Sequence, residues 1–213
     1  HFLSMAPSSP PTTRTRTQRI RWHVEDLHEA LEATPVARRL ESGDIEPDTY
    51  RHLHGQLWHL HRAVDEALKE ERASLDALLH DEDQRAGYLR NDLETLDALP
   101  PDPRTAPVRA VRTRLGAPRP DRPFLIGVLY VVKGARFGGK VLAGGIAEAL
   151  DVPPEPGRGL DYYLAGHDEL SGQWRAFLRG VDAADLSGEE EDAILAGARL
   201  LMEQHLALYE AYD

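Results

Sequence analysis

Apolar residues recur at helical spacing along almost the whole chain. The clearest run has its members three or four positions apart, at Tyr50, Leu53, Leu57, Leu60, Val64 and Leu68. This spacing places side chains on one face of an α-helix, whereas a half-buried strand alternates at every second residue. Runs with strand alternation are nearly missing from the sequence. The pattern therefore predicts an all-α fold.

Prolines and capping residues divide this pattern into separate helices. The first predicted helix spans residues 18–33, because Pro35 follows and the residue before a proline avoids helical geometry. The Ser187-x-x-Glu190 pair forms a capping box, which predicts the start of the last helix. The other predicted segments are a continuation to Gly43, a helix from Pro47, and stretches over 89–96, 108–115, 124–150 and 167–181. We expect a single-domain bundle of seven or eight helices.

Length, charge and composition indicate how many domains the chain forms and which classes of partner it binds. With 213 residues and no internal repeat, the chain is expected to form one domain over residues 19–213. The net charge of −11 argues against nucleic acid as a partner, because phosphate binding needs a basic surface. The chain has no cysteine, and none of its apolar runs is long enough to span a bilayer. We expect a cytoplasmic protein with no membrane partner.

The first 18 residues are predicted to be a disordered tail. From residue 6 to residue 19 the chain is rich in proline, serine, threonine and arginine, with no acidic residue and almost nothing apolar. Such a stretch cannot bury enough apolar surface to offset the entropy lost on ordering. Residues 1–4, which precede Met5, are interpreted as a cloning remnant.

Glycines interrupt the apolar stretch over 124–150. Each glycine inside a helix costs about 1 kcal/mol relative to alanine, so Gly134, Gly138 and Gly139 together cost about 3 kcal/mol. A kink, or a bare backbone surface against which something flat and bulky lies, is one explanation. Close packing between helices is the other. The sequence alone leaves both open.

His28 is a candidate ligand-binding residue on the first predicted helix. Arg21 lies two helical turns before it on the same face, where its cation can meet an anionic group of a ligand. Glu32 lies one turn after it, close enough to hydrogen-bond the imidazole directly or through water and so to orient it. A helical histidine without such neighbours is more often a surface or core residue.

Other histidines are predicted to be structural. His52, His54, His59 and His61 pair by face at a spacing of seven residues, which is about 10 Å of helix rise and too long for one metal to bridge. They are predicted to be solvated or interfacial. His205 falls in the apolar stripe of the last helix and is predicted to be a hydrogen-bonded core histidine.

Two separated motifs resemble those of the heme oxygenases. Residues 21–40 (RWHVEDLHEALEATPVARRL) resemble the opening of that family, which carries a T-x-x-x-H-x-x-x-E pattern; His28 and Glu32 match it, with Val24 in place of the threonine. Residues 129–139 (LYVVKGARFGG) are similar to the kinked distal helix of the branch associated with bacteriophytochromes, LYVLEGSxLGG. The resemblance covers nearly all of residues 19–213.

This resemblance implies an enzyme that opens heme b to biliverdin, carbon monoxide and free iron. Heme is then both substrate and cofactor, with O2 and electrons from a ferredoxin or flavoprotein reductase, and a bacteriophytochrome is an implied recipient of biliverdin. His28 is the implied iron ligand and Glu32 orients it. The resemblance also implies that the backbone of the distal helix, at Gly134, Gly138 and Gly139, covers the heme. It further implies heme contacts for Arg21, Tyr130, Arg175 and Arg179, with the three arginines holding the propionates. A solvated helix face is the alternative for Arg175 and Arg179.

The distal motif departs from the family pattern at three positions. Ala135 stands where animal-type enzymes have aspartate and bacterial ones serine, Lys133 where glutamate is usual, and Phe137 where an aliphatic residue is usual. Two alternatives therefore stay open: a non-catalytic heme-binding or heme-transfer protein on the same scaffold, and a heme-oxygenase-like di-iron oxidase. The absence of histidine and carboxylate from residues 130–142 counts against the di-iron oxidase.

Overall fold

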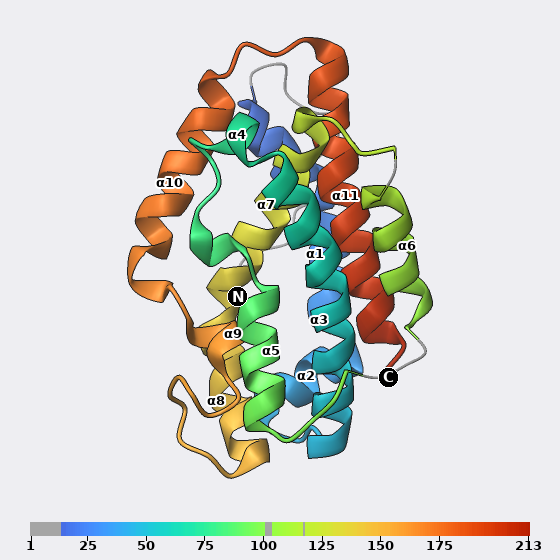
Figure 1. Ribbon diagram of the computed structural model, residues 1–213, viewed down its shortest axis with the longest axis vertical. Coiled ribbons are helices and arrows are strands. Elements are labelled where there is room, and N and C mark those ends of the chain that lie inside the picture. The colour runs from blue at the N-terminus through green and yellow to red at the C-terminus, as the bar shows by residue number, and fades with distance from the viewer. Residues whose placement is uncertain (1–13, 101–103, 117) are drawn as a thin grey trace.

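The computed structural model describes residues 14–100, 104–116 and 118–213, and all regular structure in them is helical, as predicted (Figure 1). The α-helices are α1 (Arg16–Ala33), α2 (Pro35–Ser42), α3 (Pro47–Glu70), α4 (Arg72–Leu75), α5 (Ala86–Thr95), α6 (Ala106–Leu115), α7 (Arg122–Ala135), α8 (Gly139–Leu150), α9 (Asp161–Leu164), α10 (His167–Ala183) and α11 (Gly188–Glu210). Two 3-10 turns, η1 (Asp81–Asp83) and η2 (Arg136–Gly138), lie between them. None of the described helices is long and apolar enough to cross a lipid bilayer.

The described residues form more helical segments than the seven or eight expected. The apolar stretch over 124–150 is divided at η2, and one-turn helices α4 and α9 occupy connections that carry no clear periodicity. The predicted tail is also too long at its C-terminal end. Thr15 and Gln18 form a capping box that starts α1 at Arg16, inside the segment predicted to be disordered. The rest of that segment, residues 1–13, lies outside the described residues.

Helix α11 runs lengthwise through the bundle, with α6 along one edge of the molecule in Figure 1 and α10 along the other. It packs most extensively on α7, and glycines explain how closely the two backbones approach. A Cβ on Gly127 would collide with the carbonyl oxygen of Ile194, and a Cβ on Gly197 with that of Phe124. The capping box at Ser187 and Glu190 starts α11 as predicted. The core is therefore fixed by backbone-close packing as well as by apolar side chains.

Two interruptions between consecutive helices shape the region between α1 and α8. Thr34 ends α1 and caps α2, so that α2 turns away and packs on α8. There, a Cβ on Gly145 would collide with the carbonyl oxygens of Leu40 and Glu41. The turn η2 bends the path from α7 to α8. Helix α1 thus faces a bent helix instead of a straight one.

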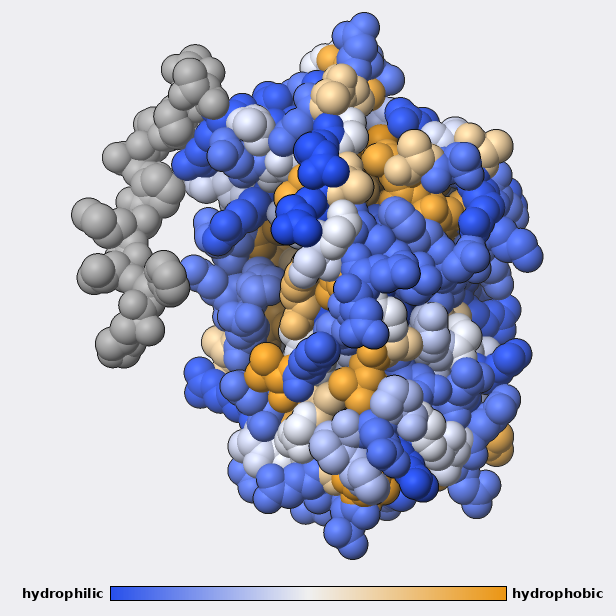
Figure 2. Space-filling model, turned by 90° about the vertical axis from the view of Figure 1, so that its left-hand side faces the viewer, coloured by the Kyte–Doolittle hydropathy of each residue, from blue (hydrophilic) through white to orange (hydrophobic). Residues whose placement is uncertain are grey.

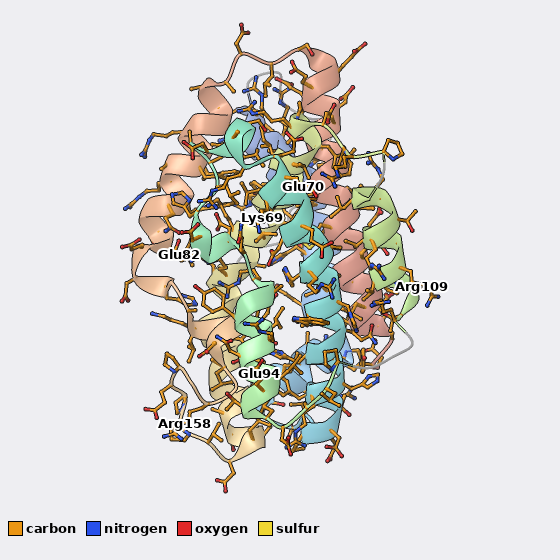
Figure 3. All side chains as sticks on the ribbon, in the orientation of Figure 1. Lys69, Glu70, Glu82, Glu94, Arg109 and Arg158 are labelled. Carbon is orange, nitrogen blue, oxygen red and sulfur yellow. The ribbon has the colours of Figure 1, made fainter. Side chains whose placement is uncertain are left out.

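Charged side chains cover most of the outside of the bundle. They project from the helices and loops into solvent, as Glu94, Arg109 and Arg158 do in Figure 3. On the face shown in Figure 2, apolar side chains appear as a narrow band between polar ones. Among the described residues, the exposed large hydrophobics are Trp22, Leu99, Phe137 and Val141.

Candidate functional site

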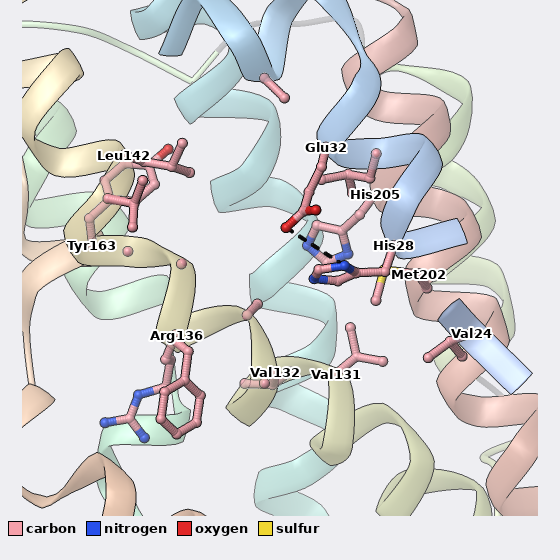
Figure 4. A pocket seen from close by; sticks show the side chains of 18 of the residues that line it. Val24, His28, Glu32, Val131, Val132, Arg136, Leu142, Tyr163, Met202 and His205 are labelled. Atoms are coloured by element: carbon pink, nitrogen blue, oxygen red, sulfur yellow. Dashed lines mark ion pairs between the residues drawn. The ribbon is translucent and has the colours of Figure 1, made fainter. Parts of the chain in front are cut away.

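A cavity of about 860 Å³ opens between α1 and the bent α7–η2–α8 segment (Figure 4). Apolar side chains from both sides form most of its walls, among them Val24, Leu31, Val131, Val132 and Leu142. Polar and charged side chains complete the lining. A cavity with apolar walls and a few placed polar groups is typical of a site for a largely apolar ligand.

His28 and Glu32 line this cavity together, one turn apart on α1. The His28 Nδ1 and Glu32 Oε1 atoms are 3.7 Å apart, which is slightly longer than a direct hydrogen bond (Figure 4). The His28 side chain keeps 56% of its surface exposed, and its imidazole is therefore open to a ligand. The two side chains lie together, as the sequence predicts.

The predicted cationic residues separate into two groups. Arg21 lines the cavity and lies 3.8 Å from Glu25, measured from Nη2 to Oε1. Arg175 and Arg179 are exposed on α10 and are not among the residues that line the cavity. The structure therefore brings one of the three arginines to the site.

Tyr130 also lines the cavity, where its ring packs on Trp174 with 5.1 Å between the ring centroids. Burial raises the pKa of the Tyr130 hydroxyl, so it stays protonated at neutral pH. Trp174 further contacts Phe137, edge to face, at 5.9 Å between centroids. An aromatic group thus forms one side of the cavity, and sequence reasoning missed Trp174 because nothing in its local pattern marks it.

The three glycines of the bend have different roles. A Cβ on Gly138 would meet no atom within 4 Å, and one on Gly134 would meet only the Trp174 ring, at 3.8 Å. These two glycines leave bare backbone at the cavity surface. A Cβ on Gly139 would instead collide with the carbonyl oxygen of Tyr163. Close packing between helices is therefore confirmed at Gly139, whereas Gly134 and Gly138 leave their backbone open to the cavity.

Lys133, one of the departures from the family pattern, belongs to a buried ion cluster. It is not among the cavity-lining residues; it pairs with Asp83, which also accepts from Arg136 at 3.0 Å. Burial lowers the pKa of the Lys133 ammonium, and the adjacent carboxylate of Asp83 opposes that shift. The cluster ties α7 and η2 to the η1 turn. Ala135 lines the cavity but offers no hydrogen-bonding group.

The α3 histidines are predicted to be solvated or interfacial, and the solvated alternative is wrong for three of them. His54, His59 and His61 are buried, because their positions adjoin the apolar stripe of α3 and face α5, α9 and the 104–105 segment. His54 bonds Asp92 at 3.1 Å, and His61 bonds the Tyr162 hydroxyl at 2.9 Å. His52 is exposed, as predicted. Their positions next to the apolar stripe of α3 are the signal that could have indicated burial.

His205 is a buried core histidine, as predicted, and it also lines the cavity. Its Nδ1 atom lies 2.8 Å from the carbonyl oxygen of Leu201. Tyr162, Tyr163, Arg85 and Arg136 also line the cavity. The cavity lining thus includes polar residues that sequence reasoning did not predict, because they come from four separate segments.

The described residues contain no group of three or more histidines and carboxylates that could hold a metal ion. The cavity-lining histidines are His28 and His205. A single imidazole suits a metal that brings most of its own ligands, as the iron of a porphyrin does. The apolar walls, the bare backbone at Gly138, the open imidazole of His28 and the cation of Arg21 all fit a flat anionic porphyrin.

Comparisons with known proteins agree with this geometry. A family model described as heme oxygenase matches residues 14–208. A comparison with curated proteins found no significant match. Among solved structures, a heme oxygenase from Leptospira interrogans superposes with a TM-score of 0.80 at 19% identity, covering 93% of this chain and 100% of that one.

Two further solved structures have the same fold. Heme oxygenase-1 from the cyanobacterium Synechocystis sp. PCC6803, in complex with heme, gives a TM-score of 0.78 at 17% identity, covering 94% of this chain and 93% of that one. The NO- and CO-bound heme oxygenase from Neisseria meningitidis gives a TM-score of 0.69 at 20% identity, covering 94% of this chain and 92% of that one. These structures share the fold over nearly the whole length of the chain.

Proposed function

The chain belongs to the heme oxygenase family, and we propose that it binds heme b in the cavity and opens the macrocycle to biliverdin, carbon monoxide and free iron. The observation that carries the proposal is the placement of the His28 imidazole and the bare Gly134 and Gly138 backbone on the lining of one apolar cavity. Bound heme supplies the redox chemistry and is consumed by it, with O2 and electrons from a ferredoxin or flavoprotein reductase.

His28 is the proposed iron ligand. Its Nδ1 atom faces Glu32 at 3.7 Å, so a small rotation of the carboxylate lets it accept the ring N–H and hold the imidazole with its Nε2 lone pair free. Glu32 is therefore a positioning residue. Its removal should leave a histidine that still reaches the cavity but is no longer held in one orientation.

The bent segment covers the other face of the proposed ligand. Gly134 and Gly138 present backbone without side chains, which lets α7 and η2 lie close to a flat ring. Gly139 acts indirectly, because its missing side chain lets α8 approach α9 at Tyr163. Tyr130 and the neighbouring Trp174 exclude water from one edge of the site.

Cations at the mouth are proposed to set the in-plane rotation of heme through its propionates. Arg21 is the cavity-lining cation suited to this role, because its planar guanidinium pairs with both oxygens of a carboxylate. Arg175 and Arg179 are proposed as additional partners, one and five residues after the cavity-lining Trp174. The resemblance of residues 129–139 to the bacteriophytochrome-associated branch supports a cytoplasmic role in supplying biliverdin to such a receptor.

The direct test is turnover with the purified protein. Hemin at one equivalent, a reductase system and O2, with catalase present to remove free hydrogen peroxide, should yield the absorbance of biliverdin and chelatable ferrous iron. A Soret band without biliverdin would contradict the enzymatic proposal and indicate a heme-binding or heme-transfer protein. Bound iron without a Soret band would indicate a di-iron oxidase. The Arg21→Ala variant, compared with Arg175→Ala, tests which cation fixes the regiochemistry of the biliverdin isomer.

A further inference from the structure

The bend between α7 and α8 is anchored by a charged side chain. Within residues 134–138, all of which the structure describes, Arg136 is the one buried residue, at 5% exposure. Phe137 is 43% exposed, and a Cβ on Gly138 would meet no atom within 4 Å, so apolar contacts fix this stretch at few points. The position of the bend therefore depends on what Arg136 contacts.

The Arg136 guanidinium bonds three residues that are not among those lining the cavity. Its Nη1 atom donates to Asp83 Oδ1 of η1 at 3.0 Å and to Gln173 Oε1 of α10 at 3.2 Å. Its Nη2 atom donates to the carbonyl oxygen of Gly166, just before α10 begins, at 2.8 Å. In Figure 4 the side chain points away from His28. A planar guanidinium can make these bonds together because its N–H groups have fixed directions.

Gly166 leaves the space that the guanidinium occupies. Its backbone has φ +70°, which L side chains rarely adopt, and a Cβ there would lie 2.7 Å from Arg136 Nη2. A larger residue at position 166 would therefore push the guanidinium out of place. The contact between η2 and the start of α10 depends on both residues.

Lys133 makes a second tie to the carboxylate of Asp83. The two side chains pair with each other and are fully buried. Lys133 and Arg136 stand on either side of Gly134 and Ala135, which line the cavity, so this short stretch of backbone is held at both ends. One carboxylate balances one ammonium. The Lys133–Asp83 pair therefore stays balanced if the charge of Arg136 is removed.

We propose that Arg136 is a positioning residue that sets the width of the cavity. By bonding three neighbouring segments, it keeps the bare backbone of the bend close enough to α1 for a flat ring with only a small group beside it. The anchoring part of the proposal stands on the ligand-free structure, whereas the size-selection part rests on the proposed function. Without Arg136, the nearest buried residues that hold the bend are Lys133 and Gly139, and the bend should move away from α1.

The anchoring part is tested without heme, by amide hydrogen exchange. Arg136→Met should fold, because methionine fills much of the same space and leaves a balanced ion pair. Exchange over residues 134–140 should speed up by about tenfold or more, with exchange in α11 unchanged. Arg158→Met removes an exposed arginine that pairs with Glu155, and as the matched control it should change neither. Wild-type exchange over residues 134–140 in Arg136→Met, or faster exchange in α11 as well, would overturn the anchoring role.

The size-selection part is tested with ferrous heme bound, by titrating methyl isocyanide and tert-butyl isocyanide and following the Soret band. Relative to methyl isocyanide, Arg136→Met should bind tert-butyl isocyanide about tenfold or more tightly than the wild type and Arg158→Met do. Gly166→Ala, which displaces the guanidinium without removing it, should shift this ratio in the same direction. It should add little to Arg136→Met, because both variants act through one contact.

An unchanged ratio of the two affinities in Arg136→Met, or fully additive effects of the two substitutions, would overturn the size-selection part. A wild type that binds heme but forms no biliverdin would contradict the proposed reaction and leave this titration valid. If hemin gives the wild type no Soret band, the proposed heme site itself fails, and hydrogen exchange still decides whether Arg136 anchors the bend.

Discussion

Two adjacent glycines in the bend should respond oppositely to one added methyl group. At Gly138 a Cβ meets no atom within 4 Å, and the backbone there has φ −70° and ψ −16°, which alanine adopts without strain. The Gly138→Ala variant should therefore gain about 0.4–1 kcal/mol, because alanine restricts the unfolded chain. At Gly139 the Cβ collides with the Tyr163 carbonyl oxygen, and α8 must shift from α9. Such overpacking costs about 1–3 kcal/mol.

The assay is thermal and urea unfolding of the ligand-free proteins. The two variants should differ by about 1.5–4 kcal/mol, the range spanned by the two effects together. At about 2–4 °C per kcal/mol for a chain of this size, the melting temperatures should differ by at least about 3 °C, with Gly138→Ala the higher. Equal unfolding free energies for the two variants would refute the assignment of Gly139 to helix packing and Gly138 to a free surface.

Heme titration of the same pair separates packing from ligand contact. The Gly138→Ala methyl group would enter the space beside the bare backbone, so it should weaken heme binding even though it stabilises the fold. A stabilised Gly138→Ala variant with wild-type heme affinity would show that the ligand does not lie against this residue.

Two further predictions concern buried charges. Asp83→Asn leaves Lys133 and Arg136 buried beside a neutral partner and should lower the free energy of unfolding, measured in urea, by about 3–5 kcal/mol. Asp81→Asn, which changes an exposed acid of the same turn, should lower it by almost nothing. Equal losses in the two variants would argue against the cluster. Burial raises the pKa of Asp65 to about 7 from 3.8, so its contribution to stability is complete below about pH 4 and is lost as the pH rises through 7. Asp65→Asn should flatten that part of the stability profile between pH 4 and 8, and an unchanged slope would contradict the shift.

Local sequence signals predicted the helices well, because each helix carries its own start and stop. Thr34-Pro35, Pro47 and the Ser187–Glu190 box act within a few residues, and the structure places helix ends at all of them. The tail boundary failed for a local reason too, since Thr15 and Gln18 form a capping box inside a polar stretch.

The site was only partly predictable, because half of it depends on contacts between distant segments. His28 and Glu32 lie one turn apart, so their proximity follows from helix geometry alone. The pairing of Lys133 with Asp83 spans 50 residues, and polar residues of the cavity lining come from α9, α11 and η2. The different roles of Gly138 and Gly139 could not be predicted from the sequence either, because only the atoms that surround each glycine in the structure distinguish them.

The central claim is that the imidazole of His28 binds heme iron from the α1 side of the cavity. Heme titration of the wild type against His28→Ala, followed by absorbance, tests it most directly, with His52→Ala as a control for the loss of an exposed histidine. The wild type and the control should saturate at one heme per chain with the same Soret maximum. His28→Ala should show a shifted Soret maximum and an affinity lower by about tenfold or more. An unchanged Soret maximum and affinity in His28→Ala would contradict the assignment.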